Sequence, residues 1–274
     1  MGKWITGGLA RREPKSNAQT FRDGAALVAA GVVMSAAMAG AVDAAVGRMA
    51  DPYAGIARGI TLKPALSLRP LLSAGREVQT ALEAGQLNDA RRLLSTHLVS
   101  RDTRDLSAAE VAGAAIESVA ENLNDSVVAP LLAFRFGGLA AAYAFRMINT
   151  ADAMLGYHTT ELEWFGKAAA RADDVVAFIP ARLAATLICC AAPGGGGSAR
   201  SAAVTAVRDA RLTASPNAGW PMAAMAGALG IRLTKRSHYT LNAAGRDATP
   251  QDIARSCRIV MVSAIFAAIL VDIT

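Results

Sequence analysis

Four acidic side chains recur at helical spacing in the middle of the chain: Glu110, Glu117, Glu121 and Asp125. Their offsets of seven, four and four residues place them within an arc of about 80° on one face of an α-helix. Like charges four residues apart repel by a few tenths of a kcal/mol per pair, so a counter-charge would stabilise such a face. A solvated helix face is one interpretation of this stripe. A divalent cation is the other, because Mg²⁺ binds carboxylates, waters and substrate phosphates.

Two further polar clusters flank apolar stretches of the chain. They are Asn149 with Asp152, and Arg171 with Asp173 and Asp174. An Asp-Asp pair at a helix start often serves only capping and dipole compensation, so this pair alone leaves both interpretations open. Arg182 lies inside an apolar run, where a charge is costly without a partner. We therefore expect Arg182 to contact one of these acids or an anionic ligand.

The turn Ser215-Pro-Asn217-Ala-Gly219 leads into another apolar segment. Turn chemistry explains each of its residues, and backbone amides at that helix start could also hold an anion. The three histidines and three cysteines show no metal-ligand or disulfide spacing, so we expect no zinc site. A glycine-rich phosphate loop followed by Lys-Ser/Thr is missing, so any ATP is bound by an uncommon site.

The elements that must position these residues are apolar helices. Hydrophobic residues make up 53% of the chain and charged residues 18%, against about 25% charged in soluble domains. Residues 24–46 are long enough to cross the hydrocarbon core, which takes about 20 residues. Further apolar runs lie at residues 127–148, 175–192, 219–231 and 258–273. We predict an all-α, polytopic integral membrane helical bundle with amphipathic or re-entrant helices, forming one membrane-embedded domain over residues 1–274.

Residues 47–106 are more polar than the rest of the chain. Apolar residues recur there at spacings of three and four from 57 to 104, which predicts two amphipathic helices broken at Gly85. The sequence Ser107-Ala-Ala-Glu110 predicts a capping box at the start of the acidic helix.

Proline and glycine mark two further positions. Pro130 is expected to end or kink the acidic helix. The sequence PGGGGS at residues 193–198 has the composition of a flexible linker.

The chain is basic, with a formal net charge of +6. Basic side chains are not interleaved with stacking aromatics, which argues against nucleic acid as a partner. Anionic lipid headgroups and an anionic ligand remain as partners for this charge. Arg and Lys are abundant on both sides of residues 24–46, so the charge distribution does not fix the membrane topology.

Four motifs stand in order along the chain. The first is Glu117-Ser-Val-Ala-Glu121-Asn122-Leu-Asn-Asp125 with Val128-Ala-Pro130-Leu131, and the second is Asn149-Thr-Ala-Asp152-Ala-Met-Leu-Gly156-Tyr157. The third is Phe165-Gly166, Arg171-Ala-Asp173-Asp174 and Ile179-Pro-Ala-Arg182, and the fourth is Ser215-Pro-Asn217-Ala-Gly219 with residues 223–230. Together they resemble the adenosylcobinamide-phosphate synthase family. The resemblance runs from about Met1 to the C-terminus.

This resemblance implies a multi-pass protein of the cell (inner or plasma) membrane that acts in cobalamin biosynthesis. The implied reaction forms an amide between a propionate of adenosylcobyric acid and the amine of (R)-1-amino-2-propanol or its O-phosphate. ATP and Mg²⁺ are the implied co-reactants, and ATP use would place the acidic motifs on the cytoplasmic side. Other corrin-assembly membrane proteins are further candidate partners.

The resemblance and the acidic sites together suggest a role for each polar residue. Mg²⁺ would be held by Glu117, Glu121, Asp125 and Asp152 with Asp173 or Asp174. An anionic phosphate or substrate group would be held by Arg171 and Arg182, with Tyr157 also in the substrate site. Ligands would be oriented by Asn122, Asn149 and Asn217, and one acid not bound to metal would take the ammonium proton.

The sequence departs from the family pattern in three places. Ser126 stands where the family usually has Gly, and Ala151 stands where a larger apolar residue is usual. Met1-Gly-Lys-Trp-Ile5 resembles a stretch that normally follows an upstream apolar helix, so the chain is expected to lack that element.

Two rival functions stay open at this point. One is a membrane transporter that uses the acids as an ion or proton path. The other is a non-catalytic corrinoid-binding or scaffold subunit. Release of ADP that depends on corrinoid and amine would favour the enzyme over both.

Overall fold

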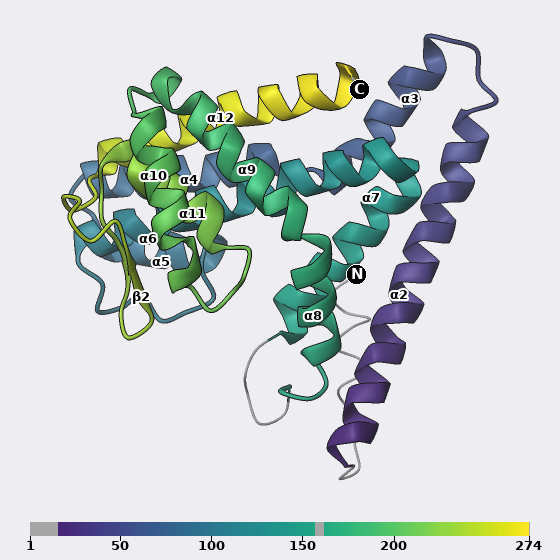
Figure 1. The fold of residues 1–274 in the computed structure, drawn as a ribbon, viewed down its shortest axis with the longest axis horizontal. Coiled ribbons are helices and arrows are strands. Elements are labelled where there is room, and N and C mark those ends of the chain that lie inside the picture. The colour runs from purple at the N-terminus through teal and green to yellow at the C-terminus, as the bar shows by residue number, and fades with distance from the viewer. Residues whose placement is uncertain (1–15, 157–161, 274) are drawn as a thin grey trace. The chain divides into compact units, whose positions relative to one another are not determined.

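Helices make up most of the chain in the computed structural model, which describes residues 16–156 and 162–273 (Figure 1). The chain divides into two compact units. Unit 1 comprises residues 1–66 and 129–177, and unit 2 comprises residues 67–128 and 178–274. The expectation of one membrane-embedded domain stays a prediction.

The elements of each unit follow in chain order. Unit 1 contains α2 (Asn17–Val46), α3 (Tyr53–Leu62), η1 (Lys63–Ala65), α7 (Ala129–Leu155) and α8 (Lys167–Val176). Unit 2 contains α4 (Leu68–Glu83), α5 (Leu87–His97), α6 (Ala108–Leu123), η2 (Asn124–Val128), α9 (Phe178–Ala191), η3 (Ala192–Gly195), α10 (Ala199–Asp209), η4 (Ala210–Leu212), α11 (Gly219–Leu229), β1 (Leu233–Lys235), β2 (Tyr239–Leu241) and α12 (Pro250–Ile273).

Four helical segments within the described residues are long and apolar enough to cross a membrane. They are Asn17–Val46, Ala108–Leu155, Phe178–Gly195 and Pro250–Asp272. The predicted helical membrane fold is therefore confirmed. A short antiparallel hairpin, in which Leu233 of β1 pairs with Leu241 of β2, adds to the helices.

In unit 1, α2 lies along α7 and α8 (Figure 1). Its buried residues recur every three or four positions: Gly24, Val28, Gly31, Ser35 and Ala39. A Cβ atom at Gly24 would overlap the carbonyl oxygen of Phe165, so glycine permits this close approach. Away from the buried face, Val33 and Met38 are each 66% exposed. Large apolar side chains exposed on a helix of spanning length suit a surface that faces lipid.

Helix α7 is interrupted at Gly137 and Gly138, whose backbone is not helical. Gly138 has a φ of 62°, in the left-handed region that favours glycine. An interrupted helix leaves backbone N–H groups without intrahelical acceptors. The N–H of Leu139 points to the Asp43 carboxylate at 3.5 Å, and the Arg58 side chain pairs with the same carboxylate at 2.8 Å. The charge of Asp43 is thus satisfied within unit 1.

In unit 2, α6 is the central helix, and residues 111–120 are all buried. It packs against α4, α5, α11 and α12. The predicted capping box is confirmed: Glu110 N–H donates to Ser107 Oγ, and Ser107 N–H donates to Glu110 Oε2 at 2.8 Å. The predicted break at Gly85 is also confirmed, because this residue separates α4 from α5 with a φ of 71°.

The helical segment Ala108–Leu155 continues through Pro130, so the proline does not end the acidic helix as expected. The change in helix geometry lies in the turn directly before it. Residues Asn124–Val128 form a π-helical turn, a form that often occurs at functional sites. Pro130 has no N–H to donate to the carbonyl of Ser126 four residues earlier. That carbonyl instead accepts a hydrogen bond from the Ser67 N–H at 3.1 Å. The start of α4 is thereby fixed to the end of α6.

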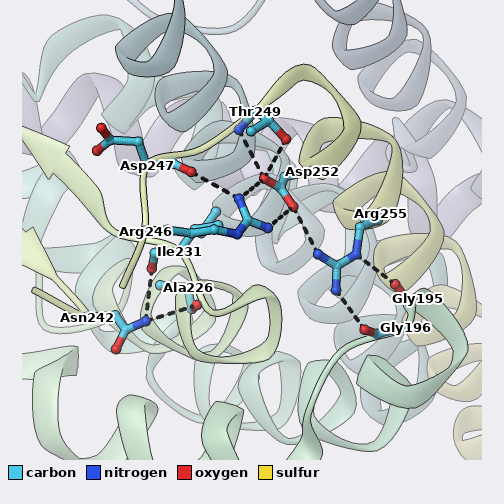
Figure 2. Close-up of polar contacts among 10 residues, drawn as sticks. All are labelled: Gly195, Gly196, Ala226, Ile231, Asn242, Arg246, Asp247, Thr249, Asp252 and Arg255. Atoms are coloured by element: carbon cyan, nitrogen blue, oxygen red, sulfur yellow. Dashed lines mark hydrogen bonds and ion pairs between the residues drawn. The ribbon is translucent and has the colours of Figure 1, made fainter. Parts of the chain in front are cut away.

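The glycine run at 193–198 is an anchored turn, so the prediction of a flexible linker was wrong. Figure 2 shows Arg255 of α12 donating to the carbonyls of Gly195 and Gly196, at 3.2 and 2.6 Å. A Cβ atom at Gly195 would overlap Ile259 of α12, which explains the glycine. Composition alone suggested a linker, whereas packing against α12 requires small residues in this turn.

A buried carboxylate organises the same region (Figure 2). Asp252 is 1% exposed and accepts hydrogen bonds from Arg246 at 2.6 and 2.7 Å and from Arg255 at 3.0 Å. The backbone N–H and hydroxyl of Thr249 also donate to it. Asp252 therefore caps the start of α12 and joins it to the loop that carries Arg246.

Candidate functional site

The acidic face of α6 separates into two parts in the structure. Both carboxylate oxygens of Glu110 bind the Arg236 guanidinium at 2.5 Å, and Glu110 also closes the helix cap. Glu117, two turns further on, is only 5% exposed. The cap and the ion pair explain Glu110 as a structural residue. The candidate functional residues of this face are therefore Glu117 and those after it.

Glu117 keeps unused hydrogen-bonding capacity in a buried setting. Its Oε2 lies 3.5 Å from Nη2 of Arg101, while its Oε1 is buried and has no hydrogen-bond partner among the described residues. Tyr239 of β2 lies beside the carboxylates of Glu117 and Glu121. Burial, and then these two carboxylates, raise the pKa of the Tyr239 phenol, which therefore stays protonated. A buried carboxylate oxygen without a donor is costly in a folded protein unless a ligand uses it.

The π-helical turn carries the next predicted site residue, Asp125. The side-chain amide of Asn124 donates to Asp125 Oδ1 at 2.8 Å, and the Asn124 Oδ1 atom is buried without a partner in the described chain. One turn earlier, the Asn122 amide donates to the carbonyl of Ser118 at 2.9 Å. Polar side chains thus continue along α6 into the turn.

The predicted metal ligands belong to both units. Glu117, Glu121 and Asp125 lie in unit 2, and Asp152, Asp173 and Asp174 lie in unit 1. Over residues 16–156 and 162–273, no three His, Cys, Asp or Glu side chains gather closely enough to hold a metal ion. Mg²⁺ often needs only one or two carboxylates when substrate phosphates and waters complete its coordination. The unpaired Oε1 of Glu117 would fit an Mg²⁺ ion whose other ligands come from waters and phosphates better than one held by protein alone.

In unit 1, the structure brings together two residues of the predicted clusters. The Asn149 amide donates to Asp173 Oδ1 at 3.4 Å and its Oδ1 accepts from Arg146 at 3.2 Å. Asn149 therefore links α7 to α8. Asp152 lies one turn further along α7, and a Cβ atom at Gly156 would overlap its carboxylate.

A cavity of about 240 Å³ in unit 1 contains two more predicted residues, Arg171 and Asp174. Glu163 and Lys167 also line it, so both charge signs face the same space. Burial raises the pKa of Asp174, and the charge of Arg171 opposes this shift. Tyr157, which the sequence places in the substrate site, lies outside the described residues.

In unit 2, Arg182 is held by neutral groups. Its guanidinium donates to the Asn217 side chain at 2.6 Å and to the carbonyls of Pro216 and Phe178 at 3.0 and 2.8 Å. It also lies over the rings of Phe178 and Trp220. The structure thus brings Arg182 and Asn217 together. Its contacts within the described chain fix the guanidinium without neutralising it, which suits a site for an anion.

Sequence reasoning missed two residues beside Glu117, namely Arg101 and Tyr239. Arg101 belongs to the charged run before the Ser107 cap, and a search for a counter-charge to the acidic stripe could have selected it. Tyr239 comes from the short hairpin, whose local sequence gives no sign that it contacts a helix 122 positions earlier.

Comparisons with known proteins give a consistent result. A sequence model of the CobD/Cbib protein family matches residues 1–260. The cobalamin biosynthesis protein CobD of Geobacter metallireducens is 45% identical over 214 residues, covering 78% of this chain and 66% of that protein. The probable cobalamin biosynthesis protein CobD of Methanothermobacter thermautotrophicus is 40% identical over 196 residues, covering 72% and 65%. The chain thus spans just under two thirds of the length of these relatives. No solved structure gives a match.

Proposed function

This chain belongs to the CobD/Cbib family, and from that premise we propose that it acts in cobalamin biosynthesis as an amide-forming membrane ligase. The proposed reaction joins (R)-1-amino-2-propanol, or its O-phosphate, to a propionate of adenosylcobyric acid. The names of the related proteins support the pathway. The chemistry of the step rests on the four sequence motifs and on the polar sites around them.

An amide does not form from a carboxylate and an ammonium in water without activation. In the proposed route, a propionate oxygen attacks the γ-phosphorus of ATP, which releases ADP and leaves an acyl phosphate. The amine nitrogen then attacks the acyl carbon, and inorganic phosphate leaves. The ammonium must lose protons along this path, and a carboxylate that is not engaged with a cation can take one. Mg²⁺ on ATP supplies charge neutralisation for the phosphates.

The acidic helix and the unit 1 cluster supply carboxylates for this reaction. Glu117, Glu121 and Asp125 are the proposed cation-binding group of unit 2, and Glu117 presents the oxygen that is best placed for a cation. Its Oε1 is the buried oxygen without a donor. Asp152, Asp173 and Asp174 form the proposed acidic group of unit 1, where Asn149 orients Asp173.

Anionic parts of the substrates require positive charge that is already oriented. Arg182 meets this need because Asn217 and two backbone carbonyls fix its guanidinium without neutralising it. Arg171, in the cavity with Lys167, is the corresponding proposed site of unit 1. Both arginines would hold a phosphate or a carboxylate by charge-assisted hydrogen bonds.

The observation that carries this proposal is the buried, unpaired carboxylate oxygen of Glu117, which lies in the region that matches the family. The test uses the purified chain in detergent with adenosylcobyric acid, MgATP and either aminopropanol or its O-phosphate. Mass spectrometry should show that the corrinoid gains the mass of the amine less one water. One ADP should be released for each amide formed. An unchanged corrinoid after prolonged incubation with both amines would refute the ligase activity of this chain.

A transporter is the rival that the structure bears on most directly. Interrupted helices with acidic residues at membrane depth are typical of transporter ion sites. The interruption in α7 has such an acid, Asp43, but Arg58 and the Leu139 N–H already occupy its carboxylate. This pairing favours a structural role for Asp43. Corrinoid-dependent ADP release would separate the ligase from the transporter and from a scaffold.

The apolar helices support membrane residence. We propose a multi-pass protein of the cell membrane whose acidic helix faces the cytoplasm, where ATP is available. Its proposed partners are adenosylcobyric acid, the amine, ATP, bilayer lipids and other corrin-assembly membrane proteins.

A further inference from the structure

A small cavity in unit 2 lies at the junction of α4, α5, α6 and η2. Its volume is about 210 Å³, well above what one water needs and below the roughly 300–1,000 Å³ of pockets for drug-sized ligands. Its lining includes Ser67, Leu71, Ala74, His97, Asn122 and Ser126. The apolar residues come from α4, and most of the polar residues come from the other elements. The cavity suits a short molecule with both polar and aliphatic parts.

The polar groups of this cavity retain hydrogen-bonding capacity. Ser126 is only 6% exposed, and no hydrogen bond among the described residues involves its hydroxyl. Asn122 uses its amide nitrogen on Ser118, which leaves its side-chain oxygen available. The Ser67 side chain does not cap α4, although it stands at the N-cap position. Of the three residues, Ser126 is buried, whereas Ser67 and Asn122 are partly exposed at the cavity. Because buried polar groups are normally satisfied, the Ser126 hydroxyl points to a polar occupant, which the two neighbouring side chains can also reach.

The backbone holds the walls of this cavity in place. The Ser67 N–H donates to the Ser126 carbonyl at 3.1 Å, which joins the start of α4 to the π-helical turn. That carbonyl is available because Pro130 lacks the N–H that would otherwise compete for it. Ser67 and Ser126 therefore keep a fixed separation across the cavity, as a binding site requires.

One ionisable side chain, His97, lines the cavity. The His97 side chain is 44% exposed and lies 3.9 Å from the carboxylate of Glu77. The lining contains no Arg or Lys. The surroundings therefore favour a cationic or neutral head group over a bare anion.

We propose that this cavity binds the short amino alcohol that the ligase couples to the corrin, with Ser67, Asn122 and Ser126 as its hydrogen-bonding residues. This inference rests on the proposed function for the identity of the ligand. Of the three proposed substrates, only the amine is small enough, because ATP and the corrin far exceed the cavity. Leu71 and Ala74 contact the aliphatic carbons, and the polar wall binds the hydroxyl and the amine.

The experiment measures binding separately from turnover. The full chain in detergent is titrated with 1-amino-2-propanol, and in parallel with its O-phosphate, by ligand-observed NMR without ATP or corrinoid. Comparison of the two titrations tells which form of the amine the site accepts. Ser126→Ala should weaken binding about fivefold, the loss expected for one hydrogen bond. Ser126→Val, which also fills part of the cavity, should weaken it at least about tenfold.

A matched control is Ser263→Ala. Ser263 is a fully buried serine of α12 whose hydroxyl has no partner in the described chain, and it does not line the cavity. This variant should bind the amine as the unmodified chain does. Equal binding in both Ser126 variants, or no binding of either amine by the unmodified chain, would overturn the proposal and leave a cavity that holds water only. Normal binding without any amide product would instead refute the ligase reaction while keeping the site.

Discussion

Replacing Glu117 by Gln should separate function from stability. Glu117 is 5% exposed, its Oε1 has no partner in the described chain, and its ion pair with Arg101 is 3.5 Å long. A buried unsatisfied polar group costs about 1–3 kcal/mol. Gln keeps the shape and removes the charge, whereas Arg101 is 27% exposed and stays hydrated. We therefore expect the free energy of unfolding to stay constant or rise by about 1 kcal/mol.

The rate of amide formation by Glu117→Gln should fall, although its stability does not. If the Glu117 carboxylate contacts the cation or the reacting amine, its loss should slow amide formation by about 100-fold or more, as expected for a group that acts in the transition state. The assay measures corrinoid-dependent product by mass spectrometry, alongside thermal unfolding in the same detergent.

Glu110→Gln is the matched control on the same helix. Glu110 pairs with Arg236 at a partly exposed site, where the side chains are 25% and 57% exposed. Such pairs contribute about 0–1 kcal/mol, and Gln still supports a capping box. The variant should lose up to about 1 kcal/mol of stability and keep normal turnover. Equal activity in the two variants would refute the functional assignment of Glu117.

The remaining predictions concern the other carboxylates, the glycine turn and the membrane. Glu121→Gln and Asp125→Asn should each reduce turnover by about 100-fold while leaving the thermal unfolding temperature within a few degrees of the unmodified chain; near-normal rates would reduce the stripe to a polar surface. Asp252→Asn should lower the free energy of unfolding by about 3 kcal/mol, because two arginines lose a buried partner, and a loss under about 1 kcal/mol would mean that packing alone holds this region. Gly195→Ala should cost about 1–3 kcal/mol by overlap with Ile259, whereas a true linker would tolerate the change. The protein should sediment with membranes and resist carbonate extraction, and a monodisperse detergent-free soluble species would contradict the four apolar helices.

The amino-acid sequence determined the local features of this protein. Apolar runs of spanning length predicted the membrane helices because a helix in lipid satisfies its own backbone. The Ser107–Glu110 cap and the break at Gly85 were predicted for the same kind of reason, since each depends on residues within one or two turns. The sequence also supplied the polar residues of the site, since few carboxylates occur in such an apolar chain.

Tertiary structure decided which of those residues work together. Glu110 pairs with Arg236, which is 126 positions away, and this contact distinguishes it from Glu117 on the same helical stripe. Arg182 was expected to meet an acid or an anionic ligand, yet its partners are Asn217 and backbone carbonyls, up to 35 positions away. The turn at 193–198 has the composition of a linker, but Arg255 anchors it from 59 and 60 positions away. No local pattern encodes such pairings, because they depend on where the packed helices bring distant side chains together.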